Sequence, residues 1–62
     1  MKINKNDFYV IIQTDKDNVV TDWFHWRVYP GRYVMSAYNQ MKNKETYKIY
    51  KLIGLQEVTN EN

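Results

Sequence analysis

The side chains with the greatest capacity for chemistry are concentrated in one stretch, TDWFHWRVYPGRY, which covers residues 21–33. It holds five aromatic rings, two arginines and the only histidine of the chain, His25. Tryptophan, tyrosine and arginine are the residue types that dominate protein–protein hot spots. Interleaved rings and cations also stack on the bases and follow the phosphates of single-stranded nucleic acid. The stretch therefore predicts recognition of another molecule and leaves open whether that molecule is protein or nucleic acid.

Catalytic and metal-binding chemistry has few candidates in the rest of the chain. Besides His25 there is one serine, Ser36, and no cysteine, so a nucleophile–base pair would have to unite these two side chains. The layout expected below places them on different faces. One histidine with scattered carboxylates matches no recognised metal-ligand set, and two glycines are too few for a glycine-rich phosphate loop. We therefore expect no enzyme: no catalytic residues, no metal site and no cofactor.

The length of 62 residues is that of one small domain, taken here as residues 1–62. Without cysteine, dense packing of the ten aromatic side chains or burial against a partner must stabilise it. The longest aliphatic run, Val10–Ile12, is far shorter than the ~20 residues of a membrane span. The basic start lacks the apolar stretch of a signal peptide. We expect a cytoplasmic protein without membrane contact, or one of the host cytoplasm if the gene belongs to a phage.

Positive charge is concentrated in the middle of the chain, although the net charge is only +2. Residues 25–51 carry six lysines and arginines against Glu45 alone, whereas the segments on either side are net negative. A basic middle favours an acidic partner surface. The acidic ends and the small net charge make single-stranded nucleic acid the less favoured partner.

Local patterns predict four elements and a turn. A run of aromatic and β-branched residues indicates a first strand, and the Asx-rich sequence after it suits a tight turn. Apolar residues at i, i+3, i+4 and i+7 after a proline indicate one helix. The expected elements are a strand Phe8–Thr14, a turn Thr14–Asn18, a strand Val19–Tyr29, a helix Arg32–Asn43 and a strand Thr46–Leu55. The predicted class is α+β: a three-stranded, antiparallel-containing sheet with one helix packed on one face (β-β-α-β), an ordered core over about residues 7–55, and a frayed tail at 56–62.

The alternation of strand residues divides the predicted sheet into a covered and an uncovered face. One helix covers one face only, and we assign to it the more apolar set. The predicted covered face consists of Phe8, Val10, Ile12, Phe24 and Trp26, under the helix residues Val34, Ala37, Tyr38 and Met41. The predicted uncovered face is the partner-binding site and consists of Trp23, His25, Arg27, Tyr29, Tyr9 and Ile11. Such a patch usually marks an interface, although mutual covering of the rings or a homodimer would also shield it.

The succession of elements, which closes with YKIYKLIGLQEV at residues 47–58, resembles a class of small phage-encoded proteins. The resemblance covers the strand–strand–helix–strand pattern over residues 8–58 of host-inhibitor and anti-defence proteins, such as the podophage inhibitors of host RNA polymerase. It implies a non-catalytic protein-binding module that inhibits or modulates a host protein. On this interpretation the partner is a host protein, a second copy of the chain is a further partner, and nucleic acid remains the alternative.

Overall fold

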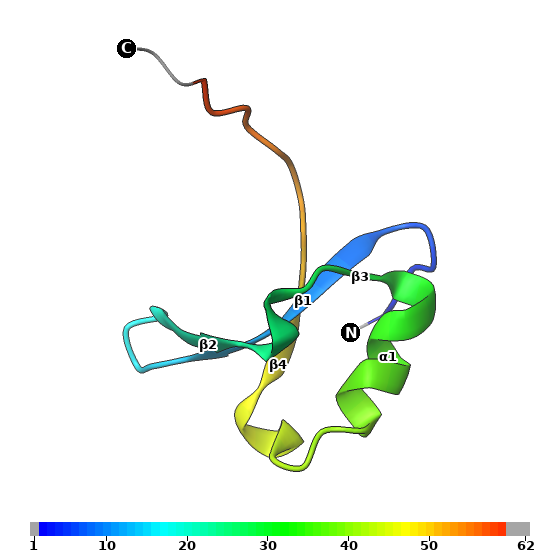
Figure 1. The fold of residues 1–62 in the computed structure, drawn as a ribbon, viewed down its shortest axis with the longest axis vertical. Coiled ribbons are helices and arrows are strands. Elements are labelled where there is room, and N and C mark those ends of the chain that lie inside the picture. Colours follow the sequence, from blue (N-terminus) through cyan, green and yellow to red (C-terminus); the bar gives the residue numbers. More distant parts are fainter. Residues whose placement is uncertain (1, 60–62) are drawn as a thin grey trace.

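The computed structural model describes residues 2–59 and contains a four-stranded antiparallel sheet with a single α-helix (Figure 1). In chain order the elements are β1 (Phe8–Thr14), β2 (Val20–Trp23), the 3-10 turn η1 (Phe24–Trp26), β3 (Tyr29–Pro30), α1 (Gly31–Asn39), the 3-10 turn η2 (Lys44–Thr46) and β4 (Lys48–Lys51). The α+β class is confirmed, with one strand more than predicted because the second predicted strand is divided. Within residues 2–59 the structure has no helix of the length and apolar character that a membrane crossing requires.

β1 is the central strand of the sheet, and its sequence FYVIIQT explains why. Aromatic and β-branched side chains favour a pleated, half-buried surface. One edge of β1 pairs with β2 and then with β3, and the other edge pairs with β4, all antiparallel. Ile12 lies opposite Trp23, and Tyr9 lies opposite Tyr29. Since directly opposite residues share a face of the sheet, these two pairs fix which side chains lie together.

The predicted turn between the first two strands is confirmed. Asp15 Oδ1 accepts hydrogen bonds from the backbone N–H groups of Asp17, at 2.8 Å, and of Val19, at 3.0 Å. Asn18 has a φ of 63°, a left-handed conformation that asparagine tolerates better than most residues. The short side chains of the Asx residues thus provide the hydrogen bonds that close the connection from β1 to β2.

The predicted continuous strand Val19–Tyr29 is wrong, and the register of the sheet gives the physical reason. Between the two paired positions β1 advances three residues, from Tyr9 to Ile12, while its partner advances six, from Trp23 to Tyr29. Three residues are therefore surplus, and the chain loops them out as η1. Because the surplus is odd, the strand re-enters the sheet with its faces exchanged. Trp23 and Tyr29, predicted to share a face, lie on opposite faces.

The core lies between α1 and the face of β1 that carries Tyr9 and Ile11. The fully or almost fully buried side chains are those of Tyr9, Ile11, Tyr29 and Val34. Those packed against them are Ile3, Phe24, Ala37, Tyr38, Met41, Tyr47 and Ile49. The helix face predicted from sequence is confirmed, although α1 ends at Asn39, four residues before the predicted end. Pro30 precedes its first residue, as a proline at a helix start should.

The sheet face assigned to the core from sequence is wrong. Tyr9 and Ile11, predicted to be uncovered, are 1 % and 0 % exposed, whereas Phe8 is 53 % exposed. Trp26, predicted to be core, is 79 % exposed. The side chains on the sheet surface opposite α1 form what we call the helix-free face, which consists of Phe8, Val10, Ile12, Trp23, Tyr50 and Leu52.

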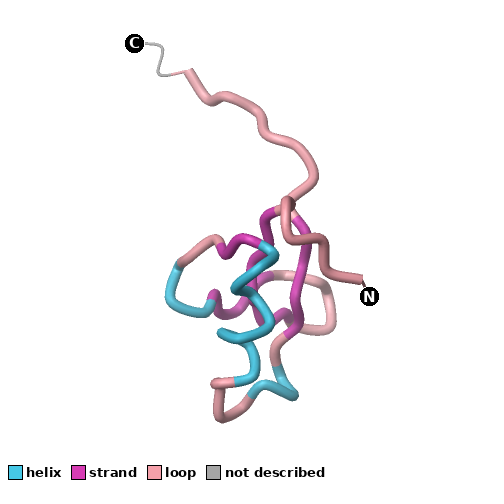
Figure 2. The backbone as a smooth tube through the Cα atoms, turned by 90° about the vertical axis from the view of Figure 1, so that its right-hand side faces the viewer, coloured by secondary structure: helices cyan, strands magenta, loops and turns pink. Residues whose placement is uncertain are grey.

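The last strand is shorter than the predicted Thr46–Leu55. β4 ends at Lys51, and the backbone N–H of Leu52 still donates to the carbonyl oxygen of Phe8 at 2.9 Å. Beyond this bond β1 offers no further residue to pair with, since it begins at Phe8. The chain from Ile53 onward leaves the body in both views (Figures 1 and 2). Residues 56–59 of the predicted frayed tail are exposed and outside any element, and 60–62 lie beyond the described residues.

Candidate functional site

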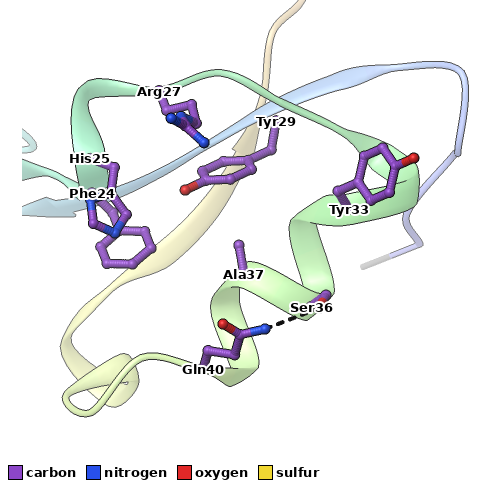
Figure 3. Close-up of a pocket in the computed structure, with 8 residues that line it drawn as sticks. All are labelled: Phe24, His25, Arg27, Tyr29, Tyr33, Ser36, Ala37 and Gln40. Carbon is purple, nitrogen blue, oxygen red and sulfur yellow. Dashed lines mark hydrogen bonds between the residues drawn. The ribbon is translucent and has the colours of Figure 1, made fainter.

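A groove between η1 and α1 is the place where polar, charged and aromatic side chains converge (Figure 3). Its volume is about 430 Å³. One wall comes from η1 and the chain leading into β3, and the other from α1. The lining residues are Phe24, His25, Arg27 and Tyr29 on the first wall and Tyr33, Ser36, Ala37 and Gln40 on the second.

The two walls follow from local structure. The three looped-out residues of η1 displace the chain from the sheet and so leave room beside the helix. On α1 the groove residues fall at positions 33, 36, 37 and 40, which is one stripe of a helix next to the stripe that meets the core. Tyr29 is 9 % exposed and returns the chain to the core at the base of the groove.

The electrostatic character of the groove is basic and aromatic. Arg27 is its one permanent cation among the lining residues, and no carboxylate lines it. In Figure 3 the guanidinium of Arg27 points toward the Tyr29 ring. The His25 ring lies over Phe24 with centroids 4.1 Å apart. Gln40 Nε2 donates a hydrogen bond to Ser36 Oγ at 3.4 Å, so the α1 wall presents a short polar pair.

His25 and Ser36 were expected on different faces, and this placement is wrong, because both line the groove. They stand on opposite walls (Figure 3). Within residues 2–59 the hydrogen-bond partner of the Ser36 side chain is Gln40, not His25. Nucleophilic catalysis needs the hydroxyl within hydrogen-bond reach of its base and a third group to orient that base. In the described residues the Ser36 hydroxyl is thus hydrogen-bonded to Gln40 across one turn of the helix, and His25 stacks on Phe24. No group of three or more potential metal ligands occurs in the described part of the chain.

The structure separates the six residues predicted to form one binding face into three places. His25, Arg27 and Tyr29 meet in the groove. Trp23 lies on the helix-free face, where it is half-buried, and its Nε1 donates to the carbonyl oxygen of Arg27 at 3.1 Å. Tyr9 and Ile11 belong to the core. Trp23 is separated from Tyr9 because a register shift between Gln13 and Thr14 pairs it with Ile12. Tyr9 and Ile11 are buried because α1 packs on their face of the sheet.

Two groups of residues near the site were missed by sequence reasoning. Tyr33, Ser36 and Gln40 form the α1 wall, and their helical spacing was the signal that could have placed them on one stripe. Trp26 was assigned to the core and is instead 79 % exposed beside Trp23, with ring centroids 5.8 Å apart. The residue types of η1 do not predict a turn, because none of the three is a glycine, asparagine or proline.

The backbone of η1 is strained at two consecutive residues. His25 has a φ of 54° and Trp26 a φ of 52°. The left-handed region costs an L-residue about 1–2 kcal/mol because Cβ crowds the following carbonyl oxygen. A hydrogen bond from the backbone N–H of Arg27 to the carbonyl oxygen of Phe24, at 3.4 Å, and the Trp23–Arg27 bond hold the turn closed.

Tyr47 contacts the Phe24 wall of the groove and provides a titration test of that contact. Its ring meets Phe24 edge-on at a centroid distance of 6.5 Å, and its hydroxyl donates to Asp22 Oδ2. This hydrogen bond, then burial, then the charge of Asp22 raise the pKa of Tyr47 above its usual 10.0. A raised pKa in the folded state means that the stabilisation is present below pH 10 and is lost as the pH rises through the folded-state pKa.

We expect the Asp22→Asn variant to bring the pKa of Tyr47 back toward 10.0, because the charged acceptor is removed while the shape is kept. Carbon NMR of the tyrosine rings, with Tyr47→Phe to assign the signal, measures this pKa. The Asp15→Asn variant is the matched control, since Asp15 serves the turn and not Tyr47. An unchanged Tyr47 titration in Asp22→Asn contradicts the contact.

Comparison of this chain with protein-family models, with curated proteins and with solved structures finds no match. Function is therefore inferred from the groove, from the strained turn that forms one of its walls, and from the exposed tryptophan that this turn carries.

Proposed function

We propose that this protein is a non-catalytic binding module that captures a partner protein through η1 and the adjoining groove, and that it acts in the cytoplasm as an inhibitor or modulator of that partner. The resemblance in element order to small phage-encoded inhibitors of host proteins supports this class of function. The single observation that carries the proposal is the exposure of Trp26 on a strained backbone.

The backbone strain in η1 is not offset by burial of the Trp26 side chain. His25 and Trp26 together cost about 2–4 kcal/mol of backbone strain. Trp26 recovers little of it by burial, because 79 % of its surface is exposed. Strain of this kind clusters at binding sites, where the surrounding structure holds a side chain ready for its partner. An exposed tryptophan next to an arginine has the composition of a binding hot spot.

The groove indicates the chemistry of the partner segment. Arg27 is unopposed by any carboxylate among the lining residues, so it favours a partner carboxylate. The rings of Phe24, Tyr29 and Tyr33 offer apolar surface beside it. The polar pair Ser36–Gln40 offers a hydroxyl and an amide for backbone hydrogen bonds. These features suit a segment with an acidic residue next to an apolar one.

Single-stranded nucleic acid is the second candidate, and the rings beside Arg27 favour it. The distribution of cations is less favourable. Lys2, Lys5 and Lys51 line a different hollow, near the N-terminal segment, and Lys51 is paired with Asp7 at 3.2 Å. A single cation in the groove provides few phosphate contacts, so oligonucleotide binding through it should be weak and only slightly dependent on salt.

The test is affinity capture by the tagged full chain from a lysate of the cells that carry the gene, with and without nuclease. We expect Trp26→Asn and Arg27→Ala each to weaken capture of a partner protein about 30-fold or more, the effect of removing a hot-spot side chain. Asparagine tolerates the left-handed φ, so Trp26→Asn should change the free energy of unfolding by less than about 1 kcal/mol.

Met35→Ala is the matched control for this capture, because Met35 is an exposed apolar residue of α1 that does not line the groove. Equal capture by the parent, Trp26→Asn and Arg27→Ala would show that another surface binds the partner. Capture that disappears with nuclease, together with direct oligonucleotide binding, would favour the second candidate.

A further inference from the structure

The helix-free face of the sheet is a second apolar surface, separate from the groove. Phe8 is 53 % exposed, Tyr50 39 % and Leu52 38 %. Val10 lies opposite Tyr50, so the apolar strip continues across β1 and β4. Phe8, Val28, Leu52, Gly54 and Leu55 line an apolar hollow at the end of this face where the C-terminal segment departs. A contiguous apolar surface of this kind needs a partner.

The C-terminal segment 53–59 has matching chemistry. Its apolar side chains are almost fully exposed: Ile53 at 82 %, Leu55 at 95 % and Val58 at 90 %. Gly54 and Leu55 line the hollow at the end of the chain's own helix-free face. The segment as a whole continues the direction of β4, so residues 56–59 would have to reverse to lie across that face (Figures 1 and 2). Seven extended residues span up to about 23 Å, which exceeds the ~10 Å width of three paired strands.

The surface area of the chain is larger than that of a compact monomer, in part because segment 53–59 stands away from the body. A compact monomer of 7.6 kDa exposes about 4,300 Å², whereas this chain exposes 5525 Å². Its radius of gyration is 13.2 Å, against about 10.6 Å for a compact domain of this length. The excess of about 1,200 Å² exceeds the ~800 Å² that one partner contributes to a standard interface. A partner that covers the tail and the helix-free face would bring the chain to the usual burial.

We propose that two copies of this chain form a dimer in which segment 53–59 of each copy lies across the helix-free face of the other. One chain carries both surfaces, so a reciprocal exchange buries all of them at once. Charge is complementary as well: segment 53–59 carries Glu57 and no cation, and Lys48 lies on the helix-free face opposite Ile12. This inference does not rest on the groove, which stays open on the other side of the sheet.

The experiment is sedimentation equilibrium of the full chain from about 1 to 100 µM, since dimer formation depends on concentration. We expect a mass approaching twice 7.6 kDa at the upper end. Leu55→Lys should raise the dissociation constant at least about 30-fold, because each dimer buries two copies of this side chain. Leu55 is 95 % exposed, so the monomer fold should be unaffected. Val19→Lys is the control, since Val19 is 57 % exposed and lies in the turn after β1.

A mixture of isotope-labelled and unlabelled chains locates the contact independently of any variant. We expect intermolecular NOEs from the methyl groups of Leu55 and Val58 to the rings of Phe8 and Tyr50. A monomer throughout the concentration range overturns the inference, whether its tail is free or folded back on its own chain. A dimer without these intermolecular NOEs, or one that Leu55→Lys and Val19→Lys weaken equally, also overturns it.

Discussion

Replacement of Gly31 by alanine is expected to lower the free energy of unfolding by more than about 3 kcal/mol, enough to leave much of the protein unfolded. A Cβ at this position would lie 1.9 Å from the backbone oxygen of Asn4 and 2.7 Å from its carbonyl carbon. These are backbone atoms, so no side-chain rotation relieves the overlap. The N-terminal segment would have to move away from the start of α1.

That movement would break two hydrogen bonds that dock the segment. The N–H of Gly31 donates to the carbonyl oxygen of Asp7 at 2.8 Å, and the N–H of Asn4 donates to the Tyr9 hydroxyl at 2.9 Å. Ile3, which packs against the core, would move as well. A net loss of about 1 kcal/mol for each hydrogen bond, together with the lost packing, gives the stated size.

Thermal and urea unfolding followed by circular dichroism measure the loss at Gly31. Arg32→Ala is the matched control, because Arg32 follows Gly31 in the first turn of α1 and its side chain is exposed. We expect that control to melt within a few degrees of the parent. If Gly31→Ala did the same, the N-terminal segment would not lie against α1 as described.

The features that sequence reasoning predicted correctly are those with a local cause. β1 has the predicted bounds because seven consecutive residues favour a strand and the turn after it has its own side-chain acceptor, Asp15. The inner stripe of the helix followed from the 3.6-residue period alone, and Val34 is fully buried as that period requires. Both predictions depend on local sequence alone and not on which element packs on the other side of the core.

The faces of the sheet could not be predicted because two irregularities break the alternation along residues 19–29: a register shift opposite Gln13 and Thr14, and the turn η1. Trp23, Phe24 and Trp26 each favour a strand. Their strand propensities therefore give no sign of the turn that Phe24–Trp26 forms. One residue more or fewer in η1 would have placed Tyr29 on the face of Trp23, away from Tyr9, since the side-chain period is two. Only the pairing of Tyr29 with Tyr9 in the structure shows which face of the sheet Tyr29 lies on.

The candidate site was predicted in part for the same reason. His25 and Arg27 were correctly placed outside the core, because histidine and arginine are seldom buried without a partner. Their neighbours in the groove come from α1, and the sequence between them gives no register for that contact. The helical spacing of Tyr33, Ser36 and Gln40 places these residues on one stripe but does not show which other segment that stripe meets.

The adjacent rings of Phe8 and Tyr9 test the face assignment most directly, because sequence alternation and structure give opposite expectations for them. We expect Tyr9→Ala to lower the free energy of unfolding by about 3–5 kcal/mol, the range for loss of a buried ring, since Tyr9 is 1 % exposed and its hydroxyl accepts a hydrogen bond from Asn4. Phe8→Ala should lower it by about 1 kcal/mol or less, because Phe8 is 53 % exposed.

Urea unfolding of both variants at two protein concentrations separates monomer stability from any contribution of self-association. Tyr9→Phe isolates the hydroxyl and should lose only about 1 kcal/mol, the net value of one hydrogen bond. If Phe8→Ala were the more damaging change at the lower concentration, the helix would cover the face predicted from alternation. Tyr29 would then not line the groove beside α1, because it lies opposite Tyr9 and shares its face of the sheet.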